Sequence, residues 1–252
     1  RILKEKFVLP RKKFRLPHRL KQIQQEYDAI YVAIGAHTDK KLGLEGEDSK
    51  NVISAVDMLR EIGDGAYPDY TGKRVVVVGG GNVAMDCART AMRANAETVS
   101  IVYRRRQEDM TALPAEVEGA IAEGIELVTL KAPLRVEADA EGNACALWVQ
   151  PQIIGPVKGG RPSPRKANKP EERMECDIVL VAIGQDIVSE PFADFGMAVN
   201  RGRIAADKGG AANMVGVYAG GDCVSGPATV IKAIAAGKAA AANIDEYLGY
   251  HH

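Results

Sequence analysis

The sequence predicts an α/β fold with two similar domains, each built on a parallel sheet. One observation is a run of four valines, residues 75–78, that leads directly into three glycines and then into a segment with an apolar face at helical spacing. The other is a repeated pattern, in which an acidic residue opens an apolar run that closes in Ala-Ile-Gly, at 28–35 and again at 177–184. Two such strands indicate two copies of one kind of fold.

The segments before the glycines predict short elements. In chain order they are a strand, a polar helix, a buried strand and a second helix, at 7–9, 18–23, 27–36 and 54–62. Ser54 and Asp57 have the spacing of a helix cap. The stretch 63–72 is rich in Gly, Pro and Asp, and it predicts a domain boundary.

The glycine segment 79–84 fits the pattern G-x-G-x-x-A between a strand and a helix. In that context the pattern is typical of dinucleotide binding, although a plain glycine turn is the alternative. Gly79 allows the tight turn, Gly81 lets the backbone approach a pyrophosphate, and Ala84 permits close packing of helix on strand. The N–H groups at the start of the helix would face the phosphates, and the other binding residues proposed here are Gly80, Asn82 and Val83.

The strand expected at 98–103 ends in Arg104-Arg105-Arg106, about 20 residues after the glycines. An NAD site carries an acidic residue at this place, which binds the ribose 2′-hydroxyl. A carboxylate would repel a 2′-phosphate, whereas guanidinium groups bind one bidentately. The sequence therefore predicts NADPH, bound by Arg104 and Arg105, with Arg106 as a weaker candidate and a solvated basic turn as the alternative.

The rest of the chain alternates helices and strands. A helix opened by proline, three strands, a further strand and a final alanine-rich helix are expected at 114–121, 126–132, 134–138, 144–153, 176–185 and 228–248. Residues 139–143 have the composition of a hairpin turn. Residues 155–173 contain many Gly, Pro and Lys residues, so we expect a loop there.

Composition argues against several other classes of protein: nucleic-acid-binding, membrane-spanning and cysteine-dependent redox or metal proteins. The 252 residues carry 33 basic and 33 acidic side chains, so no basic excess indicates a nucleic-acid partner. No apolar run reaches the roughly 18 residues of a membrane span, and we expect a cytoplasmic protein. The four cysteines form no C-x-x-C pair, which argues against a redox disulfide, a zinc site or an iron–sulfur cluster in this chain.

Four stretches in this order carry a family resemblance: 26–35, 79–86, 103–105 with 116–117, and 220–222 with the helix that follows. They resemble the flavin-dependent pyridine-nucleotide oxidoreductases with two dinucleotide-binding domains, especially the small (beta) subunit of glutamate synthase and the matching part of dihydropyrimidine dehydrogenase. In that family the NADPH domain is inserted in the FAD domain. The resemblance implies a partial FAD-binding domain with a linker, an NADPH-binding domain and the C-terminal part of the FAD-binding domain, at 1–70, 71–186 and 187–252.

The resemblance also implies contacts with FAD. Asp222 would hydrogen-bond a ribitol hydroxyl, and Gly221 would give close backbone approach. The start of the last helix would aim its N–H groups at the flavin ring, at Thr229 and Val230. The ends of the repeated strands would add Gly35 for FAD, and Ala182 and Gly184 for NADPH. The alternative for residues 220–222 is a turn with an Asp helix cap.

One departure from the family limits what this chain is expected to do. Residues 1–26 contain no glycine, where the family carries a second glycine motif for the FAD pyrophosphate, and the upstream cysteine-rich region is absent. We therefore expect a C-terminal fragment of a longer flavoprotein. Its parent would pass hydride from NADPH to FAD, and electrons to iron–sulfur centres or a partner, including a large subunit.

Hydride transfer needs positioning more than acid–base groups, so we expect no catalytic side chain. The alternative function is a non-catalytic nucleotide-binding module that docks a partner subunit. A plain NADP dehydrogenase without flavin is disfavoured by Gly221-Asp222 and the repeated strands. We expect an exposed apolar surface where the FAD-binding part is incomplete, and self-association through it.

Overall fold

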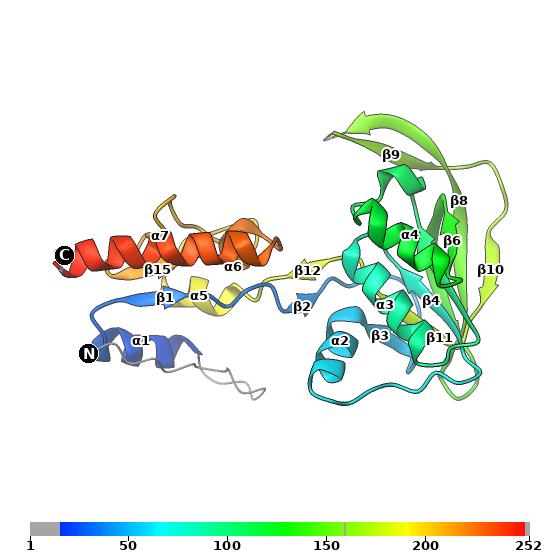
Figure 1. Ribbon diagram of the computed structural model, residues 1–252, viewed down its shortest axis with the longest axis horizontal. Coiled ribbons are helices and arrows are strands. Elements are labelled where there is room, and N and C mark those ends of the chain that lie inside the picture. Colours follow the sequence, from blue (N-terminus) through cyan, green and yellow to red (C-terminus); the bar gives the residue numbers. More distant parts are fainter. Residues whose placement is uncertain (1–15, 159, 250–252) are drawn as a thin grey trace. The chain divides into compact units, whose positions relative to one another are not determined.

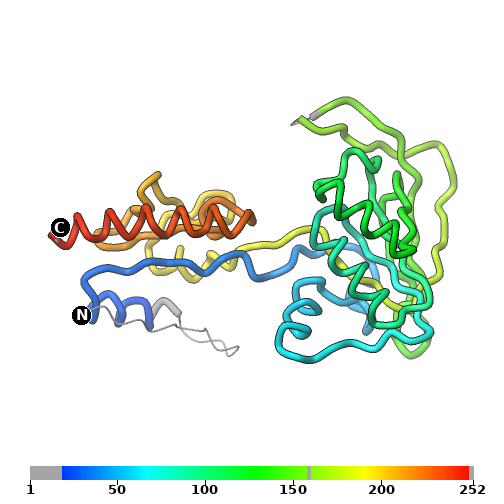
Figure 2. The backbone as a smooth tube through the Cα atoms, viewed as in Figure 1, coloured from blue at the N-terminus to red at the C-terminus, as the bar shows by residue number. Residues whose placement is uncertain are grey.

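The computed structural model describes residues 16–158 and 160–249, and the strand expected at 7–9 lies outside them. The chain forms two compact units (Figures 1 and 2). Unit 2 is residues 39–185, and unit 1 contains the chain before and after it. The α/β class is confirmed, and unit 2 interrupts the chain of unit 1. The chain passes between the units in β2 (Thr38–Asp39) and β12 (Gln185–Asp186), which pair with each other.

Unit 2 is built on a five-stranded sheet in which every pairing is parallel. In spatial order its strands are β3 (Val52–Ser54), β11 (Ile178–Val181), β4 (Arg74–Val78), β5 (Thr98–Tyr103) and β6 (Glu126–Thr129). The valines of β4 and all side chains of β11 are buried. Burial on both faces explains why β-branched and leucine residues run through these strands without alternation.

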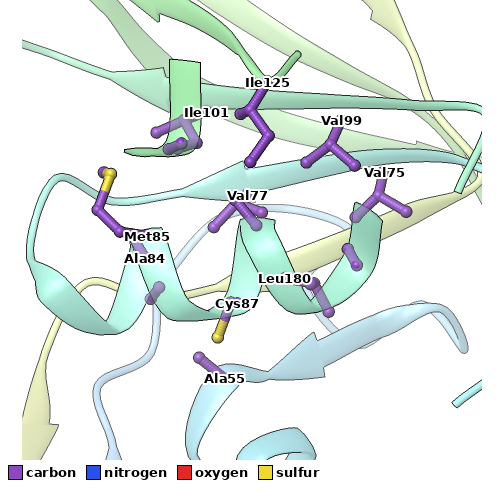
Figure 3. Close-up of a cluster of buried hydrophobic side chains, with 14 of the residues drawn as sticks. Ala55, Val75, Val77, Ala84, Met85, Cys87, Val99, Ile101, Ile125 and Leu180 are labelled. Carbon is purple, nitrogen blue, oxygen red and sulfur yellow. The ribbon is translucent and has the colours of Figure 1, made fainter. Parts of the chain in front are cut away.

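Helices cover one face of this sheet and further strands cover the other. The helices are α2 (Ala55–Gly63), α3 (Asn82–Arg93) and α4 (Pro114–Ala122). Val75 and Val77 face the helices, and Figure 3 shows them in one core with Ala84 and Cys87 of α3. The alternate residues Val76 and Val78 face a second core. Because successive strand residues point to opposite faces, β4 connects the two cores.

The second layer of strands corrects one expectation. It contains β7 (Lys131–Ala138), β8 (Ala144–Lys158), β9 (Arg161–Lys166) and β10 (Glu172–Glu175), all antiparallel to their neighbours. The stretch 155–173, expected to be a loop, holds the end of β8, all of β9 and the start of β10. Its side chains are mostly polar and exposed, so backbone pairing forms strands there without a hydrophobic pattern. We call residues 152–158 with 161–166 the β8–β9 arm.

Other boundaries also differ from expectation. The strand expected at 126–132 divides between β6 and β7 at Leu130, whose φ of 55° breaks the extended backbone. Residues 39–70, which the sequence analysis placed with the FAD-binding part, lie in unit 2. They do so because β3 pairs with β11 and because Ala55 and Met58 of α2 are buried in the first core. The sequence of β3 is too short to reveal that pairing.

Unit 1 contains a two-stranded parallel sheet, β1 (Ile30–Val32) with β15 (Val217–Ala219), and an antiparallel pair, β13 (Val199–Asn200) with β14 (Arg203–Ile204). Its helices are α1 (Leu16–Glu26), α5 (Glu190–Phe195), α6 (Asp222–Ser225) and α7 (Val230–Leu248). Phe192, Phe195 and Ile204 are buried with Val32 in its core. The strand expected at 27–36 is only three residues long, since β1 contains residues 30–32 alone. The sequence analysis did not predict α6.

An ion pair joins β4 to the residue before β11, and it leads to a prediction about acid stability. The Asp177 carboxylate accepts from the Arg74 backbone N–H at 2.8 Å and from its Nε at 3.1 Å. The Arg74 guanidinium holds the pKa of Asp177 below its usual range, so this contribution is present at neutral pH and lost as pH falls through the lowered pKa. We expect Asp177→Asn to lower the free energy of unfolding by about 1–2 kcal/mol at pH 7.

Urea unfolding at pH 7 and pH 3 measures this difference, with Asp245→Asn on exposed α7 as the control. The difference between wild type and Asp177→Asn should shrink at pH 3. An equal difference at both pH values would show that the carboxylate charge contributes nothing.

Candidate functional site

The parallel strands of unit 2 end at one edge of the sheet, and the loops that follow them gather the residues expected to bind NADPH. The glycine turn follows β4, Arg104 and Arg105 follow β5, and Ala182 and Gly184 follow β11. Ala182 donates its N–H to Val78 O at 2.8 Å. The structure therefore brings all of the residues expected to bind NADPH to the carboxyl edge of one sheet. They are Gly79, Gly80, Gly81, Asn82, Val83, Arg104, Arg105, Ala182 and Gly184.

The first two glycines of the turn are required by the protein itself. Gly79 has a φ of +154°, and a Cβ there would lie 2.3 Å from the carbonyl oxygen of Ala182. A Cβ on Gly80 would lie 2.5 Å from the ring of Tyr103. Ala84 is fully buried, and its Cβ would be 3.2 Å from the added atom on Gly79. These contacts fit a tight turn and close packing of α3 on β4.

Gly81 differs from its neighbours. It is the N-cap of α3, with an extended φ of −107°. A Cβ there would meet only Thr111 Oγ1 within 4 Å, at 3.4 Å, among the residues that the structure describes. The fold therefore has room for a side chain at Gly81. An open space at a helix N-terminus, beside N–H groups that have no partner within the helix, is the geometry that binds a phosphate.

A segment that the sequence analysis did not flag closes one side of this turn. Thr111 N donates to Gly80 O at 2.8 Å, and Leu113 N donates to Asn82 Oδ1 at 2.8 Å. The Asn82 side-chain oxygen is thus engaged by Leu113, and the Val83 side chain packs against the first core. Both residues can offer a ligand their backbone N–H groups. No hydrophobic periodicity marks residues 111–113, so the sequence gives no signal for this contact.

The three consecutive arginines have different surroundings. The Arg106 guanidinium donates to Asp109 at 2.9 Å and pairs with Glu108 at 3.0 Å. This ion pair holds the pKa of the Asp109 carboxyl below its usual range. Arg104 is exposed, and Arg105 Nε donates to a main-chain oxygen of the β8–β9 arm at 2.9 Å. Neither Arg104 nor Arg105 forms an ion pair within 4 Å among the described residues, although the Asp109 carboxylate interacts electrostatically with Arg105 from a greater distance.

In unit 1 the parallel strands β1 and β15 also end at one edge, which brings Gly35 and the segment 220–222 to the same side. Gly35 and Gly221 have φ of +67° and +74°, and a Cβ on Gly35 would meet nothing within 4 Å among the described residues. One Asp222 oxygen accepts from Ala228 N at 3.2 Å. This bond is not a helix cap, because Asp222 is the first residue of α6 and neither α6 nor α7 has a side-chain hydrogen bond at its N-cap. It leaves other acceptor positions of the carboxylate for a ligand.

The loop 226–229 leads from that bond into α7. Thr229 is the N-cap of α7, with an extended backbone, and Val230 is 75% exposed at its first turn. The first N–H groups of a helix have no partner within it. The four residues expected near FAD at this edge, Gly221, Asp222, Thr229 and Val230, therefore lie within one short stretch of chain.

Within the described residues, the cysteines and acidic groups determine whether a metal ion or a reactive thiol could be present. All four cysteines are free, and burial raises the pKa of Cys87 and Cys176 to about 12, so neither forms a thiolate near neutral pH. Within residues 16–158 and 160–249, no group of three or more His, Cys, Asp or Glu side chains could hold a metal ion. No helix in the same part of the chain has the length and apolar character needed to span a membrane.

The chain is similar to known proteins in both sequence and fold. The family model described as pyridine nucleotide-disulphide oxidoreductase matches residues 3–237. The beta subunit of the NADP(+)-dependent formate dehydrogenase of Moorella thermoacetica is 41% identical over 232 residues, which is 90% of this chain and 32% of that protein. The small chain of the NADPH glutamate synthase of Escherichia coli is 32% identical over 247 residues, which is 91% of this chain and 52% of that one.

Among solved structures, FprA of Mycobacterium tuberculosis in complex with NADPH matches with a TM-score of 0.73 at 20% identity, over 91% of this chain and 66% of that one. That likeness concerns the fold. The chain thus spans about a third to a half of the length of the two curated relatives.

Proposed function

The chain belongs to the pyridine nucleotide-disulphide oxidoreductase family, and from this premise we propose that unit 2 binds NADPH as the nucleotide module of a flavin-dependent oxidoreductase. The observation that carries the proposal is the common edge of the unit 2 sheet. There an open glycine position at the start of α3 lies at the same edge as Arg104 and Arg105, neither of which forms an ion pair within 4 Å among the described residues. Relatives named for NADPH and NADP(+) support this choice of nucleotide.

The residues of unit 2 fit the nucleotide in separate parts. The space at Gly81, which a Cβ would fill, suits the pyrophosphate, and the N–H groups of Asn82 and Val83 would donate to it. Arg104 and Arg105 would bind the 2′-phosphate. Ala182 and Gly184, at the end of β11, would contact the nucleotide through their backbones. None of these groups exchanges a proton, because the chain acts by positioning the nucleotide.

Unit 1 suits the flavin and ribitol end of FAD. The space at Gly35 and Gly221 admits close approach, and Asp222 would accept a hydrogen bond from a ribitol hydroxyl. The N-terminus of α7, at Thr229 and Val230, would stabilise negative charge on a reduced ring. When bound, NADPH and FAD supply the hydride donor and acceptor, and the chain holds and orients them.

A longer parent protein would complete the activity. There, electrons would leave the flavin for iron–sulfur centres or a partner subunit. The words "subunit beta" and "small chain" in the names of the relatives support a partner. Expression of the longer parent tests this proposal, since stoichiometric FAD together with NADPH oxidation by an artificial acceptor is expected. A parent that binds NADPH but holds no flavin would contradict the enzyme and favour a docking module.

One observation favours that second candidate. Helix α7 exposes a stripe of large apolar side chains, with Val230 at 75%, Ile231 at 79% and Ile234 at 53% exposure. An apolar patch of this kind marks a surface that other polypeptide covers, and it would also promote self-association. A docking module would bind a partner through this stripe without turnover.

Preference for the phosphorylated nucleotide tests the assignment of the arginines. We expect wild type to bind NADPH more tightly than NADH, and Arg104→Ala to lose about tenfold in NADPH affinity, because one charge-assisted contact with the phosphate is removed. Titration of both nucleotides measures this, with Arg201→Ala in unit 1 as the control. Equal affinity of wild type for NADPH and NADH would show that the arginines do not bind a 2′-phosphate.

A further inference from the structure

The tip of the β8–β9 arm contacts the carboxyl end of β5. Arg161, the first residue of β9, donates from Nη2 to the Tyr103 hydroxyl at 2.9 Å and to the Asp109 carbonyl oxygen. The carbonyl oxygen of Pro162 accepts from Arg105 Nε at 2.9 Å. The arm tip is thus anchored to Tyr103 and Arg105, one at the end of β5 and the other two residues later. Figure 1 shows β9 paired with β8 in this arm of unit 2.

Tyr103 places the arm tip beside the glycine turn. Its ring lies against Gly80, where an added Cβ would be 2.5 Å from the ring. The hydroxyl of the same ring donates to Asp109 O at 2.9 Å and accepts from Arg161. One side chain therefore separates the Arg161 guanidinium from the turn that holds the nucleotide in the proposed function.

The charges at this place do not balance. Arg106 is neutralised by Asp109 and Glu108. Among the described residues, no carboxylate lies within 4 Å of the guanidinium of Arg104, Arg105 or Arg161. The acceptors that Arg161 does contact, a hydroxyl and a carbonyl oxygen, carry no net charge. These three guanidinium groups are therefore not directly paired with a carboxylate, since Asp109 acts on Arg105 only from beyond that distance, and a bound dianion would supply the missing negative charge.

We propose that Arg161 is a third guanidinium of the 2′-phosphate subsite, brought there by the β8–β9 arm. This inference rests on the proposed binding of NADPH by unit 2. Arg104 and Arg105 approach the phosphate from the end of β5, and Arg161 approaches it from the arm. The specificity for a phosphorylated ribose then depends on two segments of the chain, represented by Arg104 and Arg161, which are 57 residues apart in sequence.

The test uses the full chain and two probes that differ only in the phosphate. Adenosine 2′,5′-bisphosphate carries the 2′-phosphate, and adenosine 5′-monophosphate lacks it. In calorimetric titration, we expect Arg161→Gln to bind the bisphosphate with about tenfold lower affinity than wild type does. Its affinity for the monophosphate should be unchanged. Arg161→Lys, which keeps the charge, should lose less. Arg165→Gln, an exposed arginine on the same strand, is the matched control and should bind both probes as wild type does.

The other outcomes separate this inference from the proposed function. If Arg161→Gln binds the bisphosphate as tightly as Arg165→Gln does, while Arg104→Ala still lowers the affinity for it, the role proposed for Arg161 is wrong and the proposed binding of NADPH stands. If Arg161→Gln weakens both probes equally, the arm only supports the fold and the inference is overturned. If wild type binds both probes equally, neither the subsite nor the nucleotide preference exists.

Discussion

Gly81→Val is expected to abolish nucleotide binding while the chain keeps its fold. Gly81 has an extended backbone, which valine adopts readily, and a Cβ there meets only Thr111 Oγ1, at 3.4 Å, within the described residues. The protein therefore accepts the side chain. The branched methyl groups would fill the space proposed for the pyrophosphate, so we expect NADPH affinity to fall by about two orders of magnitude or more.

NADPH titration and thermal unfolding of the same preparations test this expectation together. Gly80→Ala is the matched comparison, because its Cβ would lie 2.5 Å from the Tyr103 ring. That change should destabilise the fold by about 1–3 kcal/mol, since the core must shift to admit the methyl group. A folded Gly81→Val variant with normal NADPH affinity would show that the glycine turn does not bind the nucleotide.

The 252-residue chain is expected to carry little or no FAD when it is purified alone. Unit 1 offers Gly35, Gly221, Asp222 and the start of α7, which suit the flavin and ribitol end. Residues 1–26 contain no glycine, so they offer no glycine turn for the FAD pyrophosphate. The affinity for a long cofactor combines contributions from its linked parts, and losing the pyrophosphate contacts should cost many powers of ten.

An absorbance spectrum measures the flavin content directly. Oxidised flavin bound by a protein absorbs near about 450 nm, and we expect this band to be absent or far below one flavin per chain. Addition of FAD followed by gel filtration is the second measurement, and it should leave the protein colourless. A stoichiometric band would mean that residues 1–26 supply a phosphate site of another design.

The elements with strong local patterns could be predicted from the sequence. The valines of β4, the glycine turn and α3 form as expected because burial on both faces and helical periodicity leave clear marks in the sequence. Ser54 caps α2 by accepting from Asp57 N at 3.2 Å, as its spacing indicates. The α/β class and the resemblance to glutamate synthase small chains are confirmed. The roles of the individual site residues stay predictions.

The features that the sequence did not reveal depend on contacts between distant segments. The large apolar side chains of the β8–β9 arm, Ile153, Ile154 and Val157, are exposed, so its strands are held by backbone pairing rather than by burial of a hydrophobic face. Arg161 lies 58 residues from Tyr103, and nothing local marks the two as neighbours. The placement of residues 39–70 in unit 2 depends on the pairing of β3 with β11. A strand of three residues is too short for its sequence to predict such a pairing.

The two ends of residues 39–185 lie beside each other, since Lys40 N donates to Gly184 O at 3.0 Å. A module whose ends meet can interrupt a host chain at a single point without stretching it. All of the residues proposed for NADPH lie between those ends. The module could therefore be exchanged between host proteins as one cassette through two backbone junctions, so that nucleotide preference could change in evolution while the host's own chemistry was left intact.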